Sequence, residues 1–139
     1  MLMKGLNKIR RIILEYDSLR KKKYHIRSRD TFHVLVGAVL SQRTRDESTD
    51  KAAKNLFSVV SKPEDIVKMD VKRLQTLIKP SGFYRQKAKS LKKICKILIR
   101  DYGGDVPKDR ESLIKLPGVG FKTADIVLLY KFGVPTIPV

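Results

Sequence analysis

The stretch Leu116-Pro117-Gly118-Val119-Gly120-Phe121-Lys122-Thr123-Ala124 decides how this sequence folds. The glycines on either side of Val119 allow a tight reversal between two helices, and Leu116 and Val119 are expected to anchor this hairpin in the core. Backbone N–H groups at such a turn favour an anion, because the positive end of the helix dipole lies there. Gly118, Val119 and Gly120 therefore predict a sequence-independent contact with a DNA backbone phosphate, with an ordinary helix–helix turn as the alternative.

Lys122 falls in the first turn of the helix that follows the hairpin. The helix dipole, together with any partial burial, would favour its neutral amine. A neutral amine can attack an aldehyde-like carbon and form a Schiff base. The alternative is a surface lysine that contacts phosphate.

The composition indicates a polyanionic partner. The 139 residues include 31 Lys and Arg against 14 Asp and Glu, which gives a formal net charge of +17. A domain this basic is typical of nucleic-acid binding, and an anionic membrane surface is the alternative. No apolar run is long enough to span a bilayer and no signal peptide is recognisable. We therefore expect no membrane segment and a location in the cytoplasm, at the nucleoid, or in a nucleus.

Almost every apolar pattern has the period of a helix, which predicts an all-α fold of eight or nine short helices. N-caps are expected at Asp30 or Thr31, Asp46 and Asp70, and Pro107 and Asp109 are expected to open a short helix. The helices are expected over about residues 4–16, 31–41, 46–60, 64–69, 70–78, 84–102, 109–115 and 121–132. The single cysteine, Cys95, excludes an intrachain disulfide and a cysteine-based metal cluster formed by these residues.

The helix expected over residues 84–102 has two contrasting faces. Its buried stripe is expected to contain Ala88, Leu91, Ile94 with Cys95, Leu98 and Tyr102. Its other face is expected to carry Arg85, Lys87, Lys89, Lys92, Lys93 and Lys96. Lys87 and Arg85 are candidates for DNA phosphate contacts, and a solvated basic face is the alternative.

The hairpin stretch resembles the helix–hairpin–helix of the endonuclease III group of DNA glycosylases, whose pattern is Leu-Pro-Gly-Val-Gly-x-Lys-Thr-Ala. The segments Leu40–Asp46, Gly82–Ala88, Gly104–Pro107 and Phe132–Thr136 are similar to other segments of that family, in the same order. The resemblance covers nearly the whole chain. It implies two all-α domains that bind double-stranded DNA in the groove between them.

The resemblance also implies a function in base-excision DNA repair. Family members flip a damaged or mismatched base out of the duplex, and in bifunctional members a lysine beside the hairpin attacks C1′ of the sugar and cleaves the strand by β-elimination. Lys122 occupies that position, which implies a DNA N-glycosylase with apurinic/apyrimidinic lyase activity on damaged or mismatched pyrimidines. Gln42 and Arg43 fall where the family fills the gap left by the flipped base; a solvated helix end is their alternative.

The chain departs from the family pattern in three places. Val139 corresponds to the valine that precedes the family's catalytic aspartate, and the four-cysteine loop of the family's [4Fe–4S] cluster lies further downstream. We therefore expect a C-terminally truncated chain with impaired activity, no metal or cofactor of its own, and a cluster only in a full-length member. Asp125 stands where many members have asparagine, and it can pair with the Lys122 ammonium and raise its pKa.

These expectations define two regions. Residues 23–139 are expected to form a helical barrel domain, with the helix–hairpin–helix at about 109–132 and the iron–sulfur domain largely missing. Residues 1–22 are expected to form an N-terminal helix and basic linker that would pack on that missing domain. The apolar residues within 6–13 would then be exposed, which predicts self-association. A non-catalytic helix–hairpin–helix DNA-binding module remains the alternative function, because the charge and the hairpin fit both.

Overall fold

The computed structural model describes the backbone of residues 27–132 and the side chains of residues 31–129. This part of the chain is all-α and contains no strand, as the apolar period predicts. In chain order its helices are α2 (Arg27–Ser41), α3 (Asp46–Phe57), α4 (Pro63–Lys68), α5 (Val71–Leu77), α6 (Tyr84–Tyr102), α7 (Arg110–Ile114) and α8 (Phe121–Phe132). Within the same residues, no helix combines the length and the apolar character that crossing a membrane requires.

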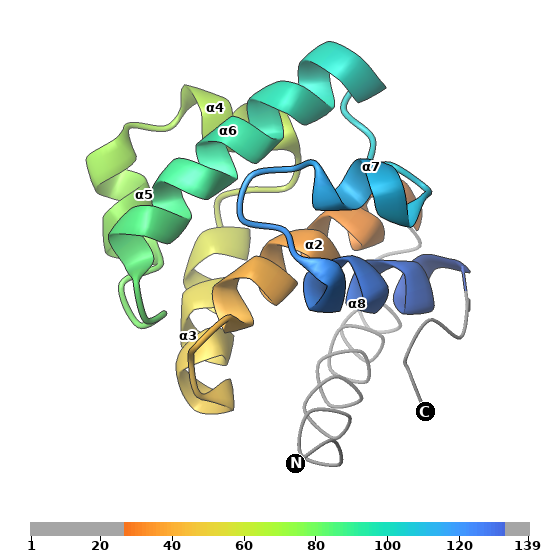
Figure 1. The fold of residues 1–139 in the computed structure, drawn as a ribbon. Helices are drawn as coiled ribbons and strands as arrows, with labels where there is room; N and C mark the ends of the chain where they lie inside the picture. The colour runs from red at the N-terminus through yellow and green to blue at the C-terminus, as the bar shows by residue number, and fades with distance from the viewer. Residues whose placement is uncertain (1–26, 133–139) are drawn as a thin grey trace.

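The second helix, α2, lies at the centre of the described helices and packs against α3, α6 and α8 (Figure 1). A helix that is apolar on nearly all sides is typical of such a central position. Its buried apolar residues are Phe32, Val34, Leu35, Val36, Ala38, Val39 and Leu40. Val34 and Ala38 are buried with the others because neighbours cover α2 on more than one side.

The longest described helix, α6, packs against α4, α5 and α2. The predicted stripe of Ala88, Leu91, Ile94, Cys95 and Leu98 is buried. Burial raises the pKa of the Cys95 thiol to about 12, so this side chain is a packing group and not a reactive thiolate. Gly103 ends the helix in the left-handed conformation that helix C-caps adopt.

Two predicted helix starts are shifted in the structure. The helix α2 begins at Arg27, ahead of the cap expected at Asp30 or Thr31, because neither glycine nor proline interrupts residues 27–31. Asp46 is the first residue of α3 and not its cap, which is Arg45. In the first helical turn, the Asp46 charge still complements the positive end of the dipole.

Asp109 caps α7, and its carboxylate accepts a hydrogen bond from the Ser112 N–H at 2.9 Å. This hydrogen bond is the main reason that the pKa of Asp109 lies below its ordinary value of 3.8. The pKa of Asp109 is lower in the folded chain than in the unfolded chain. The cap therefore contributes its full stability at pH values above the unfolded-state pKa, and it loses that stability as the pH falls through the folded-state pKa.

We therefore expect Asp109→Ala to lower the melting temperature by a few degrees at neutral pH. The difference from the unmodified chain should shrink below pH 3.8 and vanish once both states are protonated. Thermal unfolding followed by circular dichroism at several pH values measures this. Asp105→Ala, which removes an exposed carboxylate four residues away, is the control. A pH-independent difference would contradict the assignment of the cap.

The predicted N-terminal helix, the basic linker and the apolar residues within 6–13 lie outside the described residues. The boundary between residues 22 and 23 therefore stays a prediction, and so does self-association.

Candidate nucleic-acid interface

The hairpin between α7 and α8 lies against α6. Gly118 has a φ of 77°, and a Cβ at this position would be 3.1 Å from the Ser90 Oγ on α6. Both the left-handed conformation and this close approach require glycine. Leu116 and Val119 are buried as predicted, and the Val119 N–H donates to the Leu116 carbonyl at 3.1 Å. The hairpin is therefore a fixed part of the fold.

Gly120 faces solvent where α8 begins. A Cβ at this position would meet no atom within 4 Å, so the space in front of it is open to a ligand. The Gly120 carbonyl accepts the first bond of the helix, from the Ala124 N–H at 3.0 Å. The N–H groups of the first turn have no acceptor within the helix. This arrangement can hold an anion through those N–H groups and the helix dipole.

Lys122 is the second residue of α8, and its side chain is exposed. The Lys122 side chain is therefore not partly buried in the free protein. Phe121 and Lys122 at the start of α8 face solvent, whereas Thr123 and Ala124, the next two residues, are buried. The neighbouring Phe121 is 60% exposed, and the Arg110 guanidinium lies 4.7 Å from the centre of its ring. Lys122 is thus accessible to a large substrate.

Asp125, expected to pair with Lys122, has another partner. Its side chain is buried, and the Arg110 Nε lies 3.1 Å from its Oδ1. Among the described residues, the ion-pair partner of Asp125 is Arg110 rather than Lys122. The same arginine therefore connects α7 to α8 and covers Phe121.

Gln42, in the loop after α2, binds the hairpin directly. Its Nε2 donates to the Gly118 carbonyl and to the Thr123 Oγ1, both at 2.9 Å. In the free protein its amide is thus bound to the hairpin, and the role in filling a gap in DNA that the resemblance implies for Gln42 stays a prediction. Gln42 therefore fixes the position of the loop relative to the hairpin.

Arg43, the next residue, extends outward. Its backbone has a φ of 53°, its side chain is exposed, and its guanidinium lies 4.8 Å from the centre of the Phe83 ring. Phe83 also has a positive φ, 58°, and is 56% exposed. Two non-glycine residues in this rare conformation, side by side on the surface, are typical of a functional site. Sequence reasoning missed Phe83; an aromatic residue directly after Gly82, at a helix start, was the available signal.

Lys87 is the clearest correction to the sequence analysis, because both sequence-based alternatives for it are wrong. It is only 5% exposed. Its Nζ donates to four oxygens, which are the Leu40 carbonyl at 3.0 Å, the Gln42 carbonyl, the Thr44 Oγ1 at 2.9 Å and the Ser81 Oγ at 2.7 Å. The positive charge lies at the carboxyl end of α2, where the helix dipole favours a cation.

Lys87 thereby joins the two surface segments that carry Arg43 and Phe83. The Ser81 hydroxyl also donates to the Leu40 carbonyl at 2.7 Å, and the Gly82 N–H donates to the Thr44 Oγ1 at 2.8 Å. These hydrogen bonds therefore connect the loop after α2 to the turn before α6, beneath the surface that carries Arg43 and Phe83.

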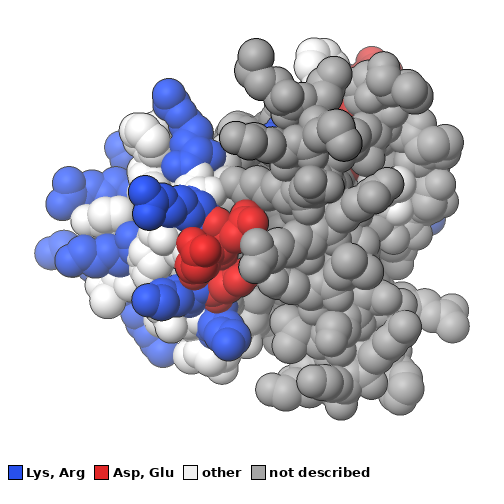
Figure 2. All heavy atoms as spheres, turned by 90° about the horizontal axis from the view of Figure 1, so that it is seen from below, with Lys and Arg blue, Asp and Glu red and all other residues white. Residues whose placement is uncertain are grey.

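The whole arrangement defines a class: an all-α, strongly basic domain of the helix–hairpin–helix type. Figure 2 shows Lys and Arg over much of the described part of one face, beside a cluster of acidic side chains. Residues 36–139 match the profile of the HhH-GPD superfamily of base excision DNA repair proteins. The chain belongs to this family.

Similar proteins agree with this assignment. The chain is 53% identical over 110 residues to endonuclease III of Thermotoga maritima, which covers 79% of this chain and 52% of that protein. It is 45% identical over 108 residues to endonuclease III of Bacillus subtilis, with 78% and 49% covered. A solved structure of a trapped endonuclease III–DNA covalent intermediate is similar, with a TM-score of 0.74 and 36% identity, over 93% of this chain and 61% of that one. The chain spans about half the length of these curated relatives.

Proposed function

We propose that this chain is the hairpin- and lysine-bearing part of a base-excision repair enzyme. The enzyme would be a DNA N-glycosylase with apurinic/apyrimidinic lyase activity on double-stranded DNA that contains a damaged or mismatched pyrimidine or an abasic site. The observation that carries this proposal is the exposed Lys122 in the first turn of α8, directly after the hairpin. Family membership supports it, and a covalent intermediate with DNA is known for one similar protein.

Lys122 would act as the nucleophile. Its neutral amine forms a bond to C1′ of the sugar while the bond from C1′ to the base breaks and the base leaves with the electron pair. The C1′–O4′ bond then breaks as the nitrogen lone pair forms a C=N bond, and O4′ takes up the proton that the amine loses, which gives the Schiff base. Loss of a proton from C2′ of this Schiff base breaks the C3′–O bond, and the phosphate leaves with the electron pair. On an abasic site the amine attacks an aldehyde and no base has to leave. Cleavage at an abasic site is therefore the less demanding reaction, compared with excision of a base.

The hairpin would supply the phosphate contact that holds the strand in place. The open space at Gly120 and the N–H groups of the first turn of α8 are suited to a backbone phosphate. Lys122 lies in that same turn, so a phosphate bound there places the adjacent sugar near the amine.

Arg43 and Phe83 would fill the gap that a flipped base leaves. Both are exposed beside one another, whereas the Gln42 amide is bound to the hairpin. An aromatic ring stacks on any base, and a guanidinium can donate hydrogen bonds to the unpaired partner base.

We expect Phe83→Ala and Arg43→Ala each to weaken binding to a duplex with a stable abasic-site analogue, by roughly 5- to 100-fold, because stacking on a base contributes about 1–3 kcal/mol. Binding to an undamaged duplex should change little, since it offers no gap. Fluorescence anisotropy with both duplexes measures this. Arg45→Ala, an exposed arginine in the same loop, is the control. Equal losses on the two duplexes would contradict the proposed role.

The iron–sulfur cluster of the family does not fit the residues of this sequence. Cys95 is the single cysteine, and it is buried within α6. The described residues contain no group of three or more His, Cys, Asp or Glu side chains that could hold a metal. Four cysteine ligands would have to come from outside these 139 residues, and no step above depends on the cluster.

A non-catalytic DNA-binding module remains the second candidate. The net charge of +17 and the hairpin fit this module as well as they fit an enzyme. Borohydride trapping on abasic-site DNA separates the two, because reduction makes a Schiff base permanent. The chain continued past Val139 by its own gene should give a covalent product, and the 139-residue chain a weaker one. If neither gives a product, the enzyme proposal fails.

A further inference from the structure

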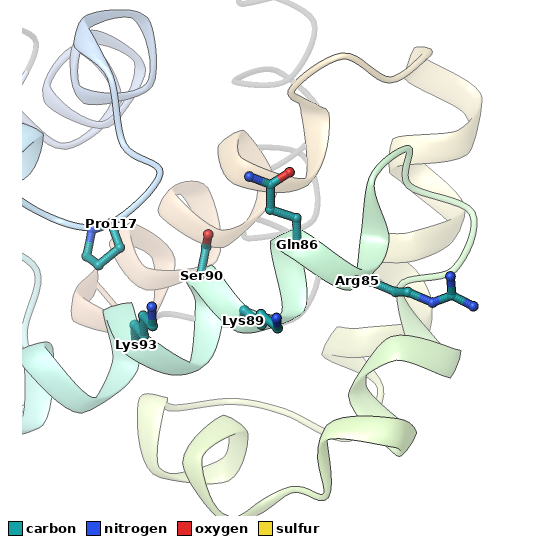
Figure 3. A pocket seen from close by; sticks show the side chains of 6 residues that line it. All are labelled: Arg85, Gln86, Lys89, Ser90, Lys93 and Pro117. Carbon is teal, nitrogen blue, oxygen red and sulfur yellow. The ribbon is translucent and has the colours of Figure 1, made fainter.

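An open depression of about 550 Å³ lies between α6 and the hairpin. Its lining residues are Arg85, Gln86, Lys89, Ser90, Lys93 and Pro117. Figure 3 shows the hairpin's Pro117 beside Lys93 and Ser90, with Lys89 and Gln86 further along α6 and Arg85 extending away from the hairpin. The depression therefore lies between Lys89 and Lys93 of α6 and the hairpin, which forms one of its walls.

The charge of these two lysines is not neutralised by α6 itself. The first acidic residue of this helix is Asp101, which forms an ion pair with Arg100 at 2.9 Å. Lys89 and Lys93 are exposed, and no carboxylate partner is found for either among the residues that the structure describes. Their charges are therefore available to an anionic ligand.

Other lysines of α6 have a structural role, which sets these two apart. The Lys87 ammonium binds oxygens at the end of α2. The Lys92 Nζ donates to carbonyls at the end of α4, those of Ile66 at 3.1 Å, Val67 at 3.2 Å and Met69. Lys89 and Lys93 are therefore the ammonium groups that α6 directs into the depression.

The wall and floor of the depression suit a phosphodiester. The Ser90 hydroxyl and the Gln86 amide are neutral donors of the kind that bind phosphate oxygens, and Pro117 has no N–H of its own. Gly118 presses against Ser90, so the depression is continuous with the hairpin. Lys89 and Lys93 are four residues apart, about 6 Å along the helix, which places both ammonium groups within reach of one phosphate or two neighbouring ones.

We propose that this depression binds a DNA backbone phosphate beyond the one held by the hairpin, so that the DNA contact surface extends along α6. This inference rests on the proposed DNA-binding function. The Lys89 and Lys93 ammonium groups supply the charge, and Ser90 and Gln86 supply hydrogen bonds.

The test compares the double variant Lys89→Ala/Lys93→Ala with Lys51→Ala/Lys54→Ala. The control lysines are exposed on α3, a helix that also carries Asp46, Glu47 and Asp50. The control variant removes the same amount of positive charge. Dissociation constants for a duplex with a stable abasic-site analogue are measured at about 50 to 200 mM salt. The Lys89/Lys93 variant should bind roughly tenfold more weakly at the lowest salt, with a log–log salt slope smaller by about 1–2. A slope equal to that of the control overturns the proposal.

Two further measurements keep this failure distinct from failure of the proposed function. Thermal unfolding of both double variants should match that of the unmodified chain, because all four side chains are exposed. Borohydride trapping tests the proposed function without reference to this depression. If trapping succeeds while the salt slope is unchanged, the depression is no DNA site and the enzyme proposal stands. If the unmodified chain does not bind the duplex, both proposals fall.

Discussion

Replacing Lys122 with alanine is expected to abolish the borohydride-trapped complex with abasic-site DNA and to slow strand cleavage by roughly a thousandfold or more. The proposed reaction has one nucleophile, and alanine has no amine to form the Schiff base. Gel electrophoresis under denaturing conditions after borohydride treatment measures the adduct, and cleavage under single-turnover conditions measures the rate.

Two other variants separate the nucleophile from the charge. Lys122→Arg keeps the positive charge, but a guanidinium is always protonated and cannot attack, so it should bind DNA normally and give no adduct. Lys115→Ala removes an exposed lysine just before the hairpin and should retain trapping. A full yield of adduct from Lys122→Ala would show that a different amine reacts.

Replacing Lys87 with methionine is expected to lower the free energy of unfolding by about 2–5 kcal/mol. Methionine fills a similar volume, but it leaves the oxygens of Leu40, Gln42, Thr44 and Ser81 without their shared donor. A buried acceptor that has lost its hydrogen-bond partner still carries the free-energy cost of its removal from water.

Urea unfolding followed by circular dichroism measures this change. Lys96→Met, at an exposed position on the same helix, should alter the free energy of unfolding by no more than about 0.5 kcal/mol. A loss below about 1 kcal/mol for Lys87→Met would mean that water replaces the ammonium, and that Lys87 does not organise the two segments above it.

The helices and the hairpin were predictable because they depend on local sequence. Leu91, Ile94 and Leu98 repeat with the helical period, and Asp109 precedes its helix as a cap should. Leu116 and Val119 are apolar residues at a turn, and they could be buried only beneath it.

The roles of individual polar side chains were harder to predict, because they depend on distant partners. The lysines of α6 look alike in sequence, yet Lys87 and Lys92 meet carbonyls of α2 and α4 while Lys89 and Lys93 meet solvent. One signal was available: Lys87 precedes Leu91 by four residues and so continues the buried stripe. No local pattern could show that Arg110 and not Lys122 pairs with Asp125.

The bonds from Gln42 to Gly118 and Thr123 join residues 76 and 81 positions apart. A ribosome makes the loop after α2 long before it makes the hairpin, so the loop has no partner until synthesis of this region is nearly complete. Contacts of such long range form late in folding, because closing the intervening chain costs entropy first. A nascent or partly unfolded chain therefore carries Lys122 before the loop after α2 has docked on the hairpin, and its attraction to DNA would be through charge alone.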